Sequence, residues 1–233
     1  MSEALRIRYR FDLPDGSQRT LDFAFDSTNF RLSNAAPADP PFWAELKFNQ
    51  CANCPLSERE HAHCPAALQM ASALEPLKAL VSFDTVGVTV LQAERAVYAE
   101  TSAQQALSSV LGLIMATSGC PWTDHLRPMA RFHLPFASEA ETVYRSICMY
   151  LMARELTGSG EPQGFAALEE LYRNLHIVNR DMSRRLGAAT RTDPARNAMA
   201  LLDSYTTLLP AALEHSLAEL RPLFDAWQTK EPV

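Results

Sequence analysis

Residues 51–64 hold the densest group of metal-binding side chains in the chain, reading Cys-Ala-Asn-Cys-Pro-Leu-Ser-Glu-Arg-Glu-His-Ala-His-Cys. Cysteine and histidine are common zinc ligands, and two thiolates separated by two residues can reach one metal ion. Three of the five cysteines are followed by proline, at Cys54, Cys64 and Cys120. Such cysteine-proline steps are frequent in iron–sulfur proteins. The pattern therefore predicts a metal site.

A closed structural site needs a fourth ligand beside Cys51, Cys54 and Cys64. Closed sites made only of cysteine are common, which favours Cys120. His61 would instead complete a local C-x2-C-x6-H-x2-C set that is similar to a compact zinc knuckle. The predicted ligands are Cys51, Cys54, Cys64 and Cys120, with zinc as the metal and a [4Fe-4S] cluster as the alternative. Without a metal, these cysteines would be core residues gathered at turns.

A second group of reactive side chains lies in residues 118–136, which are rich in proline and carry two histidines and two arginines. Loops on a rigid scaffold often carry function, and histidine beside aspartate can do acid–base work. We predict a site for a small anionic ligand at His125, Arg127, Arg131 and His133. The alternative is a loop whose arginines cap helix ends and pair with nearby glutamates.

Two further patterns predict residues outside these sites. Cys148 lies in a predicted helix beside Ile147 and is interpreted as a small buried side chain. The polar residues of the next long helix are interpreted as a solvated face. They are Arg173, Asn179, Arg180 and Arg184.

Composition limits the classes of function. The chain has 233 residues, 47% hydrophobic and 21% charged, which suits one sizeable core. A net charge of −6 argues against a duplex nucleic acid partner. We see no signal peptide and no apolar run of about 18 residues that could span a bilayer. We therefore predict a cytoplasmic protein without a membrane partner, where clustered cysteines indicate metal or redox chemistry rather than disulfides.

Hydrophobic periodicity predicts an α+β fold. Residues 4–12 and 20–26 alternate apolar and polar side chains around a Pro-Asp-Gly turn, which predicts a hairpin with arginines facing aspartates. Residues 33–41 form a linker, and 86–99 are rich in β-formers. Helical patterns begin at Pro65, Ser102, Ser138 with Glu141 as its capping partner, residue 168, Pro194 and Pro210.

These elements predict three segments within one compact unit. Residues 1–32 form the β-hairpin region, 33–65 the linker and cysteine-rich connector, and 66–233 a mainly helical domain with a short β segment near 84–100. The stretch 120–136 is predicted to be irregular.

The chain resembles a family of uncharacterised bacterial proteins. The resemblance rests on Gln-Cys-Ala-Asn-Cys-Pro-Leu at residues 50–56, Ser-Gly-Cys-Pro at 118–121, and Arg-Pro-Met-Ala-Arg-Phe-His-Leu-Pro-Phe at 127–136, followed by Glu-Thr-Val-Tyr-Arg. It covers most of the chain and implies no activity. It marks these runs as signature segments, and the histidines at 61 and 63 are less typical of it, which favours Cys120.

The function predicted from these observations is metal binding, with the metal stapling the β element to the helical bundle. The output would be binding or regulation, through a protein partner or a small anionic ligand. The chain lacks a Walker loop, a GxGxxG run, a nucleophile elbow and an HExxH motif. The alternative is a metalloenzyme or an iron–sulfur redox sensor with the 118–136 loop at its active site.

Overall fold

The sheet explains how the N-terminal hairpin is anchored. The computed structural model describes residues 5–158, 164–189 and 193–227, with the backbone alone for 208–217. Strands β1 (Leu5–Asp12) and β2 (Gln18–Phe25) pair antiparallel, as predicted. Along β1 the apolar side chains are buried and the arginines face outward. Arg8 lies opposite Asp22 and pairs with it at 2.6 Å, so the predicted cross-strand charge pairing is confirmed.

Two later strands complete the same sheet. Strands β3 (Thr85–Leu91) and β4 (Ala96–Ser102) form a second antiparallel hairpin, and the sheet order is β2-β1-β3-β4. Tyr9 of β1 lies opposite Val90 of β3. The β segment near 84–100 therefore joins the N-terminal hairpin directly, and the sheet crosses the boundary that the sequence pattern placed between residues 1–32 and 66–233.

Helices make up most of the remaining chain, so the fold is α+β as predicted. The α-helices are α1 (Pro65–Leu74), α2 (Ala103–Thr117), α3 (Arg127–Arg131), α4 (Glu139–Thr157), α5 (Ala166–Ala189) and α6 (Pro194–Leu220). The 3-10 segments are η1 (Phe42–Ala44), η2 (Glu75–Leu77), η3 (Thr123–Leu126) and η4 (Arg221–Trp227). None of the helices among the described residues is both long enough and apolar enough to cross a bilayer.

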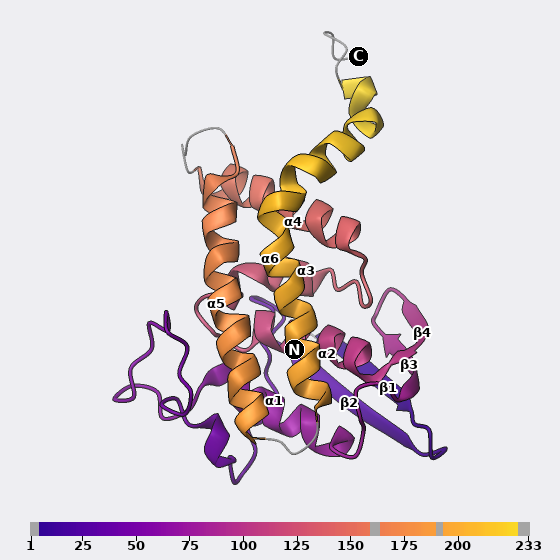
Figure 1. Cartoon of the computed structure of the whole chain (residues 1–233), viewed down its shortest axis with the longest axis vertical. Helices are drawn as coiled ribbons and strands as arrows, with labels where there is room; N and C mark the ends of the chain where they lie inside the picture. Colours follow the sequence, from indigo (N-terminus) through magenta and orange to yellow (C-terminus); the bar gives the residue numbers. More distant parts are fainter. Residues whose placement is uncertain (1–4, 159–163, 190–192, 228–233) are drawn as a thin grey trace.

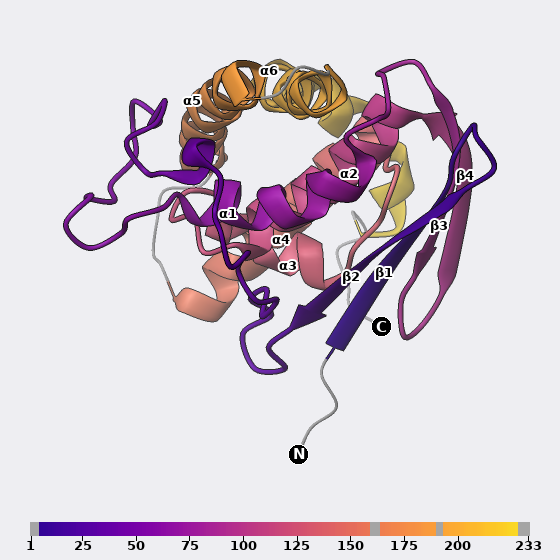
Figure 2. The ribbon, with the colours of Figure 1, turned by 90° about the horizontal axis from the view of Figure 1, so that it is seen from below.

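Helix α2 is the centre of the molecule. Figure 2 shows it between the sheet on one side and the α5–α6 pair on the other. Its side chains are buried nearly all round, as expected of a helix enclosed by other elements. In Figure 1, α5 and α6 run side by side along the long axis. The core is therefore made of three layers, which are the sheet, the central helix and the helical pair. The connector lies at the lower end in Figure 1.

Local signals place several helix ends correctly. The Ser102 side chain accepts a hydrogen bond from Gln105 N at the start of α2. Ser138 and Glu141 form the predicted capping box at the start of α4.

Because this box satisfies two backbone N–H groups, Ser138→Ala is expected to lower the free energy of unfolding by about 1 kcal/mol. Urea unfolding of both proteins would measure the difference, and an unchanged midpoint would contradict it.

Two helical predictions were wrong. Residues 120–136 are not irregular, because η3 and α3 occupy part of them. Pro210 does not start a new helix, since α6 continues through it from Pro194 to Leu220. A proline inside a helix removes one hydrogen bond and bends the axis. Figure 1 shows α6 bending in its C-terminal half.

Candidate functional site

The four cysteines predicted as ligands come from three places in the chain. Cys51 and Cys54 lie in one turn, closed by a 3.0 Å hydrogen bond from Cys54 N to Cys51 O. Cys64 is the residue before α1, and Pro65 occupies the first helical position. Cys120 follows Gly119, whose φ of +89° turns the chain away from the end of α2.

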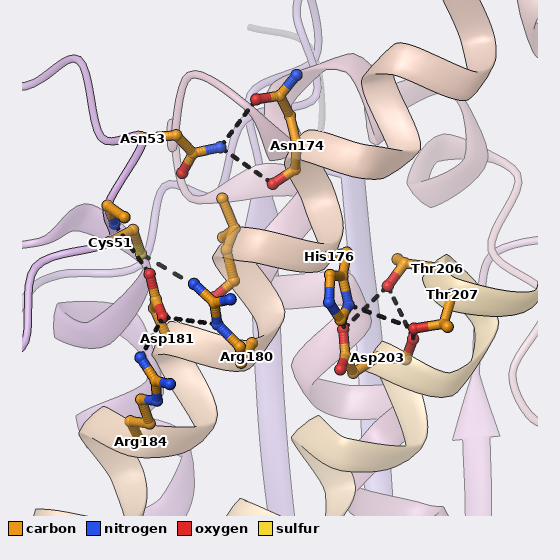
Figure 3. Close-up of polar contacts among 12 residues, drawn as sticks. Cys51, Asn53, Asn174, His176, Arg180, Asp181, Arg184, Asp203, Thr206 and Thr207 are labelled. Carbon is orange, nitrogen blue, oxygen red and sulfur yellow. Dashed lines mark hydrogen bonds and ion pairs between the residues drawn. The ribbon is translucent and has the colours of Figure 1, made fainter.

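Side chains from two directions hold the turn of Cys51. From α5, Asp181 accepts a 2.9 Å hydrogen bond from Ala52 N, and Asn53 donates to both oxygens of Asn174 at 3.1 Å. Figure 3 shows Asp181 and Asn174 reaching from α5 to this turn. From the segment after Cys120, Trp122 Nε1 donates to Asn53 O at 2.7 Å. The turn is therefore fixed between α5 and the segment that carries Cys120.

The charges that act on the Cys51 thiol include those of the other three predicted ligands. Burial raises the pKa of its thiol to about 12, and the charges of Cys64, Cys120, Asp181 and Cys54 raise it further. Burial also raises the pKa of Cys64, opposed by the N–H groups of Ala67 and Ala66 and by Arg185. Cys51 therefore lies close enough to each of the other three cysteines for their thiolate charges to act on it, and the folded chain keeps the thiols of Cys51 and Cys64 protonated at neutral pH.

The proximity of these cysteines does not by itself make a metal-binding site. Within residues 5–158, 164–189 and 193–227, no group of three or more His, Cys, Asp or Glu side chains is arranged to hold a metal ion. All five cysteines are free thiols. Of the two candidates for a fourth ligand, Cys120 is among the charges acting on Cys51, whereas His61 is exposed. The metal ligands remain a prediction.

Cys148 is exposed, so its interpretation as a buried side chain was wrong. Helix α4 is covered on one side only, where Val143 and Ile147 join a small cluster with residues of α5. Cys148 lies on the opposite face with Tyr144, Leu151 and Met152, which are 44%, 47% and 64% exposed.

This exposure predicts the order of thiol modification. Iodoacetamide on the native protein is expected to modify Cys148 first, because the other four cysteines are buried or partly buried. Peptide mapping of a time course would identify the fast site. Cys148→Ser should remove the fast phase, and a fast phase that survives in this variant would place the exposed thiol elsewhere.

Three of the four residues of the predicted anion site line one open hollow of about 740 Å³. They are His125, Arg127 and Arg131. Asp124 lines it too and forms ion pairs with Arg127 at 3.1 Å and with Arg31 at 2.9 Å. Arg131 lies over the rings of Phe30 and Phe132. Much of the positive charge in this hollow is therefore already paired or packed against aromatic rings.

His133 lies apart from this hollow, in the interior. It is 7% exposed, and its Nε2 is hydrogen-bonded to the hydroxyl of Tyr9, which also bonds Ser109 at 2.8 Å. Burial, and then the charge of Arg145, lower the pKa of His133 to about 3. Burial also raises the pKa of Tyr9. Both rings are therefore neutral at physiological pH, and they tie β1 to α2 and to the end of α3.

The neutral His133 predicts an acid-sensitive fold. The unfolded chain protonates this ring near its ordinary pKa of 6.5, whereas the folded chain does so near 3. Between these values the unfolded state binds more protons, so stability falls as pH decreases, by up to about 1.4 kcal/mol per pH unit.

Unfolding free energies measured at several pH values between 7 and 4 would check this. His133→Gln is expected to flatten the decline, and His125→Gln, at an exposed position, to leave it unchanged. An equal slope in the wild type and in His133→Gln would contradict the assignment.

His133 borders a second, more apolar cavity of about 180 Å³ between α2, α3, α4, α5 and α6. Sequence reasoning missed three polar residues that line it: Arg145, Tyr172 and Asn179. The interpretation of Asn179 as part of a solvated face was wrong, because it is 7% exposed. Its spacing held a signal, since Tyr172, Leu175, Asn179 and Met182 follow the three-and-four spacing of a buried stripe.

Comparison with protein families gives one match. Residues 7–225 match the model of a domain of unknown function, DUF6901. No curated protein and no solved structure matches the chain.

Proposed function

Because the chain belongs to the DUF6901 family, a domain of unknown function, we propose its function from the site itself. It binds one zinc ion through Cys51, Cys54, Cys64 and Cys120. The observation that carries the proposal is that the hydrogen bond of Trp122 ties the 51–54 turn to the Cys120 segment, while all four cysteines belong to or pack against the same core.

Binding would have to draw the thiols together. Zinc binds the thiolate, so loading the site releases protons from thiols whose pKa burial has raised. Zinc affinity should therefore fall steeply as pH decreases. Asp181 contributes a negative charge beside Cys51 and holds the backbone of the turn, which is how residues around a metal orient its ligands.

The bound metal would crosslink the connector to the end of α2. It would not crosslink the strands themselves to the helical bundle. The sheet is attached at the same end, because Leu32 N donates to Thr117 O at 2.9 Å. Cys120 also precedes η3 and α3, which carry His125, Arg127 and Arg131. A metal that fixes Cys120 would therefore fix the open hollow, and the protein would act as a binding or regulatory module whose hollow receives a partner or small anion.

The second candidate is a [4Fe-4S] cluster in a redox sensor or metalloenzyme. The observation that favours it is proline after three of the four predicted ligands. A brown protein that absorbs at ~400 nm would support the cluster. A colourless protein that holds one zinc ion per chain would support the proposed zinc site.

The test is metal content after anaerobic purification, measured by elemental analysis on four proteins. The wild type should hold one zinc, Cys120→Ser should lose most of it, and His61→Ala should keep it. Cys148→Ser is the matched control, since it removes a thiol outside the predicted ligand set. If Cys120→Ser keeps full content and His61→Ala loses it, the site is a local knuckle. A wild type without metal would overturn the proposal.

A further inference from the structure

The 180 Å³ cavity bordered by His133 is built differently from the open hollow. Its walls are mostly apolar, and they include Leu113, Met115, Leu126, Ala130, Leu175 and Leu202. An engineered cavity of about 150 Å³ in another protein stays dry and takes up benzene. This cavity therefore has room for an apolar body of about one six-membered ring.

Asn179 marks the cavity as a site rather than a packing defect. Its amide lines the cavity, is more than nine-tenths buried, and has no hydrogen-bond partner among the residues the structure describes. The amide atoms are not among the fully buried unpaired atoms of the described residues, so they keep accessible surface at the cavity. By contrast, the hydroxyl of Tyr172 at the same cavity is bonded to Ser146. Asn179 thus offers a hydrogen-bonding group that the fold itself does not use.

Arg145 gives the cavity its charge. It is the only charged side chain lining it within the described part of the chain. One nitrogen, Nη2, donates to Met129 O at 2.6 Å and to Phe132 O at 2.9 Å, which positions the guanidinium. The charge of Glu141, one turn earlier, acts on Arg145, but Glu141 caps Ser138 and no described carboxylate lies within ion-pair distance of the guanidinium. The other guanidinium N–H groups are therefore available to a bound anion.

Gly112 leaves space at the same cavity. It lies in the middle of α2, where glycine costs about 1 kcal/mol relative to alanine. A Cβ at this position would meet only Leu202, at an ordinary contact distance of 3.5 Å. Alanine would therefore fit and strengthen the helix, and its absence keeps the cavity open.

We propose that this cavity binds a small carboxylic acid with an apolar body. The carboxylate pairs with the free N–H groups of Arg145, the body fills the space beside Gly112, and Asn179 bonds a polar atom of the ligand or a water beside it. His133, which lines the cavity, is neutral and presents no competing charge. This site lies outside the proposed metal centre and does not depend on it.

The test compares two probes that share a body and differ in charge, phenylacetate and 2-phenylethanol, by titration calorimetry. The wild type is expected to bind phenylacetate at least 10-fold more tightly, as for a hydrogen bond to a charged group. Arg145→Gln should abolish this preference. Arg127→Gln, which removes a cation from the open hollow, should preserve it. Gly112→Leu should block both probes while the melting curve shows a folded protein.

Asn179→Leu gives a measurement that does not depend on how well the Arg145 variant folds. It removes the unpaired amide and fills part of the cavity, so it should raise the melting temperature and weaken binding of both probes. The proposal is overturned if phenylacetate shows no saturable binding, or if the two probes bind equally. It is also overturned if the preference survives Arg145→Gln and disappears in Arg127→Gln, because the anion would then lie in the open hollow.

Discussion

Replacing Arg185 with methionine is expected to lower the free energy of unfolding by about 3 kcal/mol or more, because it leaves three backbone carbonyls without their donor and each unsatisfied buried acceptor costs about 1–3 kcal/mol. Arg185 of α5 is 1% exposed. Its guanidinium donates to Trp43 O at 2.6 Å, Glu45 O at 2.7 Å and Leu46 O at 3.0 Å. Methionine fills similar volume but leaves three carbonyls of the connector without these donors, and the connector loses its tie to α5.

The matched control is Arg184→Met, one residue earlier on the same helix. The Arg184 side chain is 67% exposed and pairs with Asp181 at 3.2 Å, so its loss should cost less than about 1 kcal/mol. Urea unfolding followed by circular dichroism would compare the two variants. Equal midpoints for both would show that the carbonyl contacts of Arg185 contribute nothing measurable to stability.

Sequence reasoning succeeded where a signal and its structure lie within a few residues. Alternation predicted the first hairpin and its charge pair, Arg8 with Asp22, because side-chain direction in a strand has a fixed period. The capping box of Ser138 and Glu141 was predicted for the same reason, since both partners lie within one helical turn.

It failed where the outcome depends on contacts between distant segments. The pairing of β1 with β3 joins residues some eighty positions apart, and alternation in each strand carries no information about its partner. The exposure of Cys148 depends on which face of α4 the rest of the fold leaves uncovered. Helix α6 continues through Pro210, although proline commonly starts or breaks a helix.

The same contrast between local signals and contacts of distant segments applies to the candidate sites. Spacing within one turn predicted Cys51 and Cys54 as ligands, and the shared cysteine-proline step predicted Cys120, and this ligand set stays a prediction. The apolar cavity was missed because its polar residues, Arg145 and Asn179, come from different helices and have no common motif. Whether such residues form a site depends on their burial and on which of their polar groups stay unpaired, which only the folded chain defines.

Zinc is expected to stabilise the wild type by about 4 kcal/mol when free zinc exceeds its dissociation constant a thousandfold, because a ligand that binds only the folded state adds its binding free energy to folding. If Cys54 is a ligand, Cys54→Ser should lose this increment, even though the thiol-to-hydroxyl change is small. The apo forms of the two proteins should unfold at nearly the same denaturant concentration, since the fold without metal rests on the core around α2.

The measurement is denaturant unfolding of both proteins with zinc and with a chelator, giving four free energies. Cys148→Ser provides the fifth and sixth, because its exposed thiol lies outside the predicted ligand set and it should keep the full zinc increment. A zinc increment that persists in Cys54→Ser would exclude Cys54 as a ligand. An increment absent from the wild type would mean that these thiols contribute to the fold without a metal, as partly buried side chains packed against the core.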